Sequence, residues 1–340
     1  MIAIAAVTIG LPTVFLVIRL LAHLFDPKSY APAGGYDIFT ALVAGVLYIF
    51  GFIMAATLGC TAGSADLGDG EFRHLVITGR SRLAIYLARI PAGLSIVLSL
   101  IAIGYAIVCI VCCFAAPTTI NYNGATVPAN LSRTAFVAWA GDHPDEVLCN
   151  LPYNFPVNFP VPCGPGGPVT KEGIGPGASG PAPKAPTKAE LAGTARRIAA
   201  QDYPGYAKLF LSPSNWLMIR TGAWVELEAT VGFIVGSGLA SLIGQRTVAV
   251  ILMIVLEIIL TPIFSRASIP HFINLQRGLV GLAVDHLEPG GLPVALSGGG
   301  GSNAVSVLVS ETRVEAICVI IGWLVVWTAV GAWRMATRDA

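Results

Sequence analysis

Residues Ala92–Ala115 read AGLSIVLSLIAIGYAIVCIVCCFA, an apolar run without a single Asp, Glu, Lys or Arg. A helix needs about 20 mostly apolar residues to cross the hydrocarbon core of a bilayer. Further stretches of this kind, the shortest at the lower limit of about 17 residues, are Ile2–Leu24, Phe39–Gly59, Ala223–Ile243, Val248–Phe264 and Val314–Trp333. The sequence therefore predicts an all-α polytopic membrane protein with six transmembrane helices.

The composition of the whole chain agrees with this prediction. Of its 340 residues 55% are hydrophobic and only 11% are charged, with a mean hydropathy of +0.74. Soluble domains carry about 25% charged residues, so this chain cannot cover the surface of a water-soluble globule. A soluble enzyme, a nucleic-acid-binding domain and a disordered chain are excluded, and the net charge of +1 implies no bulk electrostatic partner.

The basic residues of the short connections predict the orientation. If the six spans alternate, the connection after the second span, the turn after the fourth and the tail after the sixth share one side. These segments carry Arg73, Arg80, Arg82, Arg89, Arg246, Arg334 and Arg338. Basic residues accumulate on the cytoplasmic side of a membrane, so both termini are expected inside. Arg19 and Lys28, taken with the first span alone, favour the opposite orientation.

These spans divide the chain into predicted regions. Residues 1–115 hold the first three spans with a cytoplasmic segment at 63–90, and residues 116–215 form a long extracytoplasmic loop. Residues 216–264 hold the fourth and fifth spans, and 313–340 hold the sixth span and a cytoplasmic tail. Between them, 265–312 begins with an amphipathic stretch that predicts a re-entrant or interfacial segment. The first span lacks a charged n-region and is expected to be a retained helix.

The long outer loop combines an irregular arm with a predicted helix. The arm, 152–186, is dense in Pro and Gly, which disfavour regular structure. Thr187 and Glu190 have the spacing of a capping box, which predicts a short helix over 187–201; a wholly disordered loop is the alternative. Cys149 and Cys163 both fall in this loop. An oxidising exterior favours a disulfide between them, and two free thiols are the alternative.

Three glutamates fall within the predicted spans. Glu257 lies near the middle of the fifth span, and Glu226 and Glu228 lie near the outer end of the fourth. Charges within spans are costly and normally face a protein interior or water. We expect these residues to line a translocation path or a helix interface, although hydrogen bonding for packing alone also fits. Residues two apart point about 200° apart on a helix, so Glu226 and Glu228 cannot both line one path.

The cytoplasmic segment after the second span carries a short amphipathic pattern. Phe72, Leu75 and Val76 share a helix face at i, i+3 and i+4 spacing, with arginines around them. An interfacial helix is the direct interpretation, and an ordinary basic anchoring loop is the alternative. Here the chain resembles permease subunits of ABC transporters of the ABC-2 type. The matching residues of this segment are Asp66, Gly70, Arg73, Leu75, Ser81 and Arg82. The turn at 242–249 and the closing Arg338-Asp339 also look like that family.

The resemblance implies a function and a set of partners. In that family this segment is the coupling helix, which contacts an ATPase subunit; here it would involve Gly70, Glu71, Phe72, Arg73, Leu75, Ser81 and Arg82. The chain would then be an exporter permease of a bacterial cytoplasmic membrane, paired with a second copy or a related permease. No Gly-Lys pair occurs, so the chain lacks a P-loop. No cofactor is expected in this chain, and ATP and magnesium would bind the partner.

Two other functions remain open at this point. One is a secondary transporter or channel driven by an ion gradient, which internal repeats would favour. The other is a non-transporting membrane protein that displays the outer loop as a sensor or assembly module.

Overall fold

A computed structural model describes residues 5–26, 36–68, 81–114, 119–122, 125–150, 161–162, 168–169, 187–260, 263–264, 273–289 and 311–337. Contacts divide the chain into two compact units. One contains Met1–Val17, Thr40–Ile110 and Ser214–Ala340, and the other contains Ile18–Phe39 and Val111–Pro213. We call the first unit the bundle and describe each unit by itself.

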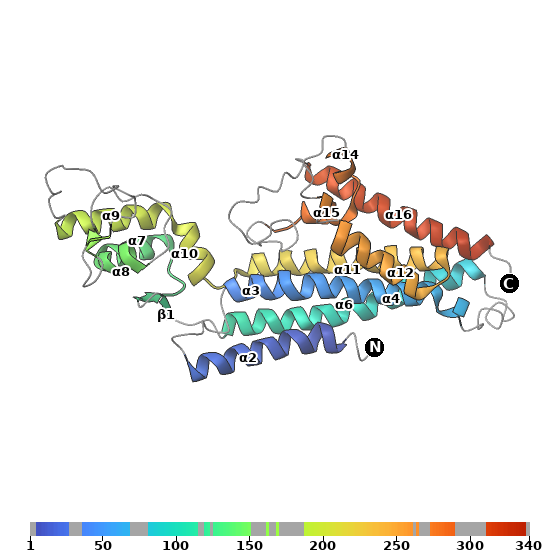
Figure 1. Cartoon of the computed structure of the whole chain (residues 1–340), viewed down its shortest axis with the longest axis horizontal. Coiled ribbons are helices and arrows are strands. Elements are labelled where there is room, and N and C mark those ends of the chain that lie inside the picture. Colours follow the sequence, from blue (N-terminus) through green and yellow to red (C-terminus); the bar gives the residue numbers. More distant parts are fainter. Residues whose placement is uncertain are drawn as a thin grey trace. The chain divides into compact units, whose positions relative to one another are not determined.

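The helices outside the second unit's small domain range in length from 4 residues in α14 to 33 in α6 (Figure 1). In chain order they are η1 (Ala6–Gly10), α2 (Leu11–Phe25), α3 (Tyr36–Leu42), η2 (Val43–Tyr48), α4 (Ile49–Gly68), α6 (Arg82–Phe114), α11 (Asn215–Ile243), α12 (Arg246–Ile254), η3 (Val255–Leu260), α14 (Ile273–Gln276), α15 (Val280–Asp285) and α16 (Arg313–Thr337). The three η elements are π-helical segments.

Within the described residues, five segments are long and apolar enough to cross a bilayer. They are Ala6–Phe25, Val46–Ser64, Leu83–Cys113, Asn215–Ile243 and Arg313–Thr337. The protein is thus helical and membrane-embedded. The remaining expected span, Val248–Phe264, coincides with α12 and η3, which run without a break from Arg246 to Leu260. Residues 261–262 lie outside the described part of the chain, so the count of six spans stays a prediction.

Among the described elements, the most extensively packed helix pair of the bundle is α4 with α11. Gly59 and Gly63 of α4 lie against the backbone of Phe233 and Ser237 in α11, where a Cβ atom would have no room. Gly236 of α11 faces Ala56 in the same way. Small residues four apart let membrane helices approach closely, so that dispersion and interhelical hydrogen bonds hold them. Helix α12 packs against both members of this pair, and α16 packs against α11.

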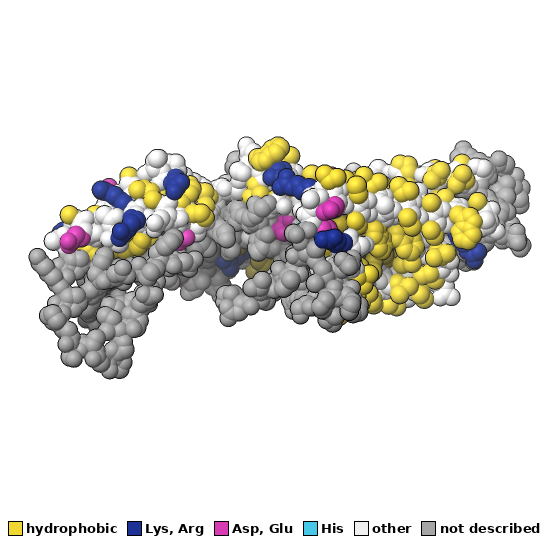
Figure 2. Space-filling model, turned by 90° about the horizontal axis from the view of Figure 1, so that it is seen from above, with side chains coloured by type: hydrophobic (Ala, Val, Ile, Leu, Met, Phe, Trp, Pro, Cys, Tyr) yellow, Lys and Arg dark blue, Asp and Glu magenta, His cyan; other side chains and the backbone are white. Residues whose placement is uncertain are grey.

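The outer surface of the bundle is apolar. Large hydrophobic side chains are exposed along α2, α6, α12 and α16, for example Val14, Ile110, Ile251 and Val325. Figure 2 shows hydrophobic side chains spread over the visible face of the bundle, on the right of the view. An exposed apolar surface this extensive is expected where lipid, rather than water, covers the helices.

The second unit contains a small domain, which we call the cap and which comprises the described residues of 119–213. Its elements are β1 (Thr119–Tyr122), β2 (Ala125–Pro128), α7 (Arg133–Asp142), α8 (Pro144–Asn150), β3 (Val161–Pro162), β4 (Pro168–Val169), α9 (Lys188–Gln201) and α10 (Tyr203–Phe210). Strands β1 and β2 pair antiparallel with Thr119 opposite Pro128. Strands β3 and β4 also pair antiparallel. Helix α9 occupies the interval that the capping-box spacing predicts, and Thr187 and Glu190 cap each other reciprocally.

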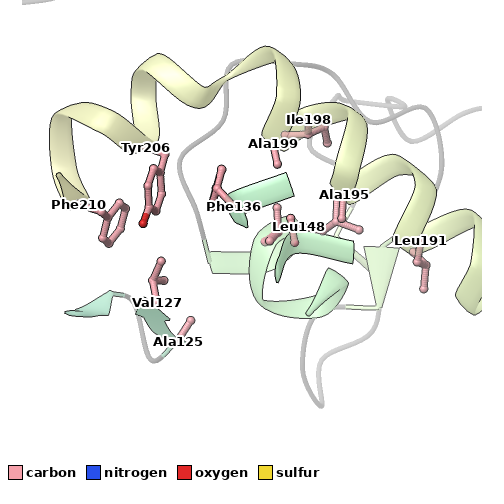
Figure 3. Packing of buried hydrophobic residues seen from close by; sticks show 12 residues of the cluster. Ala125, Val127, Phe136, Leu148, Leu191, Ala195, Ile198, Ala199, Tyr206 and Phe210 are labelled. Carbon is pink, nitrogen blue, oxygen red and sulfur yellow. The ribbon is translucent and has the colours of Figure 1, made fainter. Parts of the chain in front are cut away.

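The cap has a hydrophobic core of its own (Figure 3). Side chains from β2, α7, α8, α9 and α10 meet there, including Val127, Phe136, Leu148, Ile198 and Tyr206. The ring of Phe136 stacks on that of Tyr206 with centroids 3.9 Å apart. This part of the outer loop therefore forms a packed domain. Most of the predicted arm, 152–186, lies outside the described residues.

Candidate functional site

The first candidate site is one end of the bundle, where several helix ends meet. Arg89 of α6 donates a hydrogen bond of 3.3 Å from Nη1 to the carbonyl oxygen of Ala62 in α4. The hydroxyl of Ser241, in the last turns of α11, donates a hydrogen bond of 3.1 Å to the carbonyl oxygen of Gly63. The start of α6 and the ends of α4 and α11 therefore lie at the same level.

Helices α12 and α16 also have their basic residues at this end. Gly244 ends α11 in the left-handed conformation with φ 77°, so the chain reverses at once and α12 begins at the exposed Arg246. Tyr86 of α6 packs with Met335 of α16, which places Arg334 in the last turn of α16 at the same end. We call this end, which carries Arg82, Arg89, Arg246 and Arg334, the basic end (Figure 1, right).

The expected coupling residues are only partly described. Ser81 and Arg82 lie at the start of α6, where the Ser81 hydroxyl accepts a hydrogen bond of 3.2 Å from the backbone N–H of Ala84. Residues 69–80 lie outside the described part of the chain, and with them Gly70, Glu71, Phe72, Arg73 and Leu75. The helices on either side of this segment, α4 and α6, both have the adjoining end at the basic end.

The second candidate site is a group of acids in the bundle interior. The side chains of Glu228 in α11 and Glu257 in η3 are 1% and 3% exposed, and the two carboxyl groups interact electrostatically. Glu226 is less buried and, two residues away, lies on another face of α11. The structure thus brings together two of the three predicted glutamates and separates the third from them.

Asp285, which the sequence analysis did not single out, completes this group. It ends α15, all of whose residues are buried, and it interacts electrostatically with Glu228. Gly281, one turn earlier in α15, faces Glu257 so closely that a Cβ atom there would lie 2.6 Å from Oε2. We call Glu228, Glu257 and Asp285 the carboxylate cluster. An acid inside the apolar run VGLAVD was the available sequence signal.

Two aromatic side chains hold α15 in place beside the cluster. The hydroxyl of Tyr48 donates a hydrogen bond of 2.8 Å to Oδ1 of Asp285. The ring of Tyr48 stacks on Trp224 with centroids 4.5 Å apart, and Trp224 donates from Nε1 to the carbonyl oxygen of Val284 at 2.9 Å. On the other side, Trp323 of α16 donates to the carbonyl oxygen of Gly278 at 2.8 Å. Helix α15 is therefore tied to η2, α11 and α16.

Burial changes the proton affinity of the acids around α15. Burial raises the pKa of Asp285 to about 7, against the opposing effects of the Tyr48 hydrogen bond and of His286. Burial and the neighbouring Asp285 raise the pKa of Glu288 to about 8. Nδ1 of His286 lies 3.9 Å from a carboxylate oxygen of Glu311. Asp285 and Glu288 therefore bind a proton more tightly than an exposed carboxylate does.

The cysteines of the outer loop are described in part. Cys149, in α8, is disulfide-bonded, and the side chains of neighbouring Val147 and Leu148 are buried in the core of the cap. Cys163, its predicted partner, lies outside the described residues.

The chain was compared with family models, with curated proteins and with solved structures. No family model, no curated protein and no solved structure matches this chain.

Proposed function

We propose that this chain is the membrane-spanning permease subunit of an ATP-binding cassette exporter of the ABC-2 type. The observation that supports this proposal most directly is the basic end. The segment predicted to couple to an ATPase leaves α4 and returns to α6 there. The α11–α12 turn and the end of α16 lie at the same end.

The positive charge of the basic end supports a position on the cytoplasmic side of the membrane. Connections rich in Arg stay on the cytoplasmic side, so the basic end would face the compartment that holds ATP. Residues 70–82 would then meet a soluble partner at the membrane surface. The chain lacks a P-loop, so the work of transport would come from nucleotide binding and hydrolysis on that partner, with magnesium.

The packing of α4 and α11 suits the transmission of force. Helices in backbone contact through glycine move as one body, because neither can slide without losing its close packing. A push at the end of α4 would therefore reach α11, and α15 beyond it through Trp224. Two such bundles, from a second copy or a related permease, would enclose the path.

The proposal is tested by purifying the full-length chain from host membranes after mild crosslinking. A P-loop ATPase should copurify, and ATP hydrolysis should be measurable in the eluate. Leu75→Glu and Arg73→Glu should each reduce that hydrolysis at least about tenfold, the loss that about 1.4 kcal/mol of binding energy produces. Arg313→Glu, at the start of α16 and so at the opposite end of that helix, is the matched control. Wild-type material without a P-loop protein, or normal hydrolysis in both variants, would contradict the proposal.

A further inference from the structure

We propose that Glu228, Glu257 and Asp285 form a proton-binding site inside the bundle, which holds protons while α15 is packed against α11 and η3. The site concerns this chain alone and does not depend on the proposed ATPase partner.

The environment of Glu228 is the first support for this proposal. Its side chain is 1% exposed, and neither carboxylate oxygen has a hydrogen-bond partner among the described residues. Oδ2 of Asp285 is likewise buried without a partner in that part of the chain, while Oδ1 receives the Tyr48 hydroxyl. An ionised carboxylate taken out of water without partners costs many kcal/mol, so such groups bind a proton instead.

The neighbouring charges strengthen the argument. Within the described residues, the charged side chains that interact with Glu228 are both acidic, namely Glu257 and Asp285. Like charges at short range in a medium of low polarity repel strongly, so three ionised carboxylates cannot share this site. A proton that binds to one of these carboxylates neutralises its negative charge and needs no additional volume in the packed interior.

The groups that face the cluster from other elements do not supply enough positive charge to neutralise its carboxylates in place of a proton. Tyr48 of η2 donates to Asp285 and is neutral. His286 interacts with Asp285 but also lies beside Glu311, and Glu288 adds a further acid next to Asp285. The described groups around the cluster therefore contain more acids than bases.

The geometry favours protons over a metal ion. Among the described residues, no three acidic, His or Cys side chains are arranged to hold a metal. The backbone is also unusual at Glu257, which lies in η3, and at Tyr48, which ends η2 and donates to Asp285. Such π-helical segments occur frequently at functional sites.

The release of protons follows from the same physics. Burial keeps the acids neutral, so a motion that separated α15 from α11 and admitted water would lower their proton affinity. The site would thus take up protons on closing and give them up on opening.

Infrared spectroscopy of the full-length protein in nanodiscs tests the proposal. Protonated carboxyl groups absorb apart from carboxylates, and their band should be present near neutral pH and shift in heavy water. Glu228→Gln should remove about one carboxyl group's share of that band, and Asp285→Asn should remove a similar share at pH values below 7, because burial raises the pKa of Asp285 to about 7. Glu190→Gln is the control, because Glu190 is exposed and hydrogen bonds from Thr187 lower its pKa.

A second measurement needs no variant. Unfolding the wild-type protein near neutral pH in weak buffer should release protons, which a pH-sensitive dye records. A band that is unchanged in Glu228→Gln, or unfolding without proton release, would overturn the proposal. A band that is weak in sodium chloride and strong in choline chloride would also overturn it, because the ligand would then be sodium.

Discussion

The hydroxyl of Tyr48 donates a hydrogen bond of 2.8 Å to Oδ1 of Asp285, a residue 237 positions later in the chain. A hydrogen bond to the ionised form of an acid stabilises that form. It therefore opposes burial, which raises the pKa of Asp285 to about 7. The balance of these two effects makes Asp285 titrate near neutral pH.

The stability of the protein should fall as the pH rises toward 7. Asp285 has a pKa near 3.8 when unfolded and about 7 when folded. Between these values only the folded chain binds the proton, so raising the pH favours unfolding, by about 4 kcal/mol in all. Asp285→Asn should flatten this dependence when thermal unfolding in detergent is followed from acidic to neutral pH.

The Tyr48→Phe variant separates the hydrogen bond from burial. Loss of the hydroxyl removes the effect that lowers the pKa of Asp285, so the loss of stability should extend to higher pH. The same pH profile in Tyr48→Phe and wild type would show that the hydroxyl does not act on Asp285.

The Gly63→Ala substitution should force α4 away from α11 and destabilise the protein. The new Cβ would meet the backbone carbonyl of Ser237, and such overpacking typically costs about 1–3 kcal/mol. Gly322→Ala in α16 is the matched control, since nothing lies within 4 Å of its Cβ position, and alanine favours a helix by about 1 kcal/mol. Thermal unfolding in detergent should therefore shift in opposite directions; equal shifts would show that the close approach is not stabilising.

The positions of the membrane helices could be predicted from the sequence, because an apolar run of sufficient length has few alternatives. The ends of the helices were less predictable. Helix α11 begins at Asn215 rather than near Ala223, because Ser214 caps it by accepting from the N–H of Leu217. Hydropathy alone places the boundary where polar residues begin, whereas backbone hydrogen bonding continues past it.

The candidate site was predictable only in part. Glu228 and Glu257 stand out because a charge in an apolar span is costly. Tyr48 and Asp285 do not stand out, since their partnership arises from the packing of α15 against distant helices. The glycine pairs four apart in α4 and α11, at 59 and 63 and at 232 and 236, were a sequence signal for close helix packing that composition and hydropathy do not reveal.

The disulfide prediction can be tested by thiol labelling of the full-length protein. Cys149 is disulfide-bonded, so a maleimide should not label it, or Cys163, before reduction and should label both afterwards. Cys149→Ser should release Cys163 for labelling and lower the stability of the cap by roughly 3 kcal/mol, as expected for a short closed loop. Labelling of Cys163 in the unreduced wild type would exclude this pairing.

Asn130 should be important for joining the beginning of the cap to its end. It follows β2 in the left-handed conformation, with φ 59°. Its Oδ1 accepts hydrogen bonds of 2.7 Å from the backbone N–H of Ser212 and of 3.0 Å from the Ser212 hydroxyl. Its own N–H donates to the carbonyl oxygen of Phe210 at 2.9 Å. A short polar side chain that tolerates this conformation thus connects the two ends of the domain.

Two substitutions at Asn130 separate conformation from hydrogen bonding. Asn130→Gly keeps the left-handed backbone and loses only the side-chain bonds, which should cost about 1 kcal/mol. Asn130→Ala loses those bonds and also strains the backbone, which adds about 1–2 kcal/mol. Limited proteolysis of the full-length protein should therefore cleave the cap faster in Asn130→Ala than in Asn130→Gly, and faster in both than in wild type. If the two variants were cleaved at the same rate, the conformation of residue 130 would contribute nothing to the stability of the cap, and the side-chain hydrogen bonds to Ser212 would account for the whole loss.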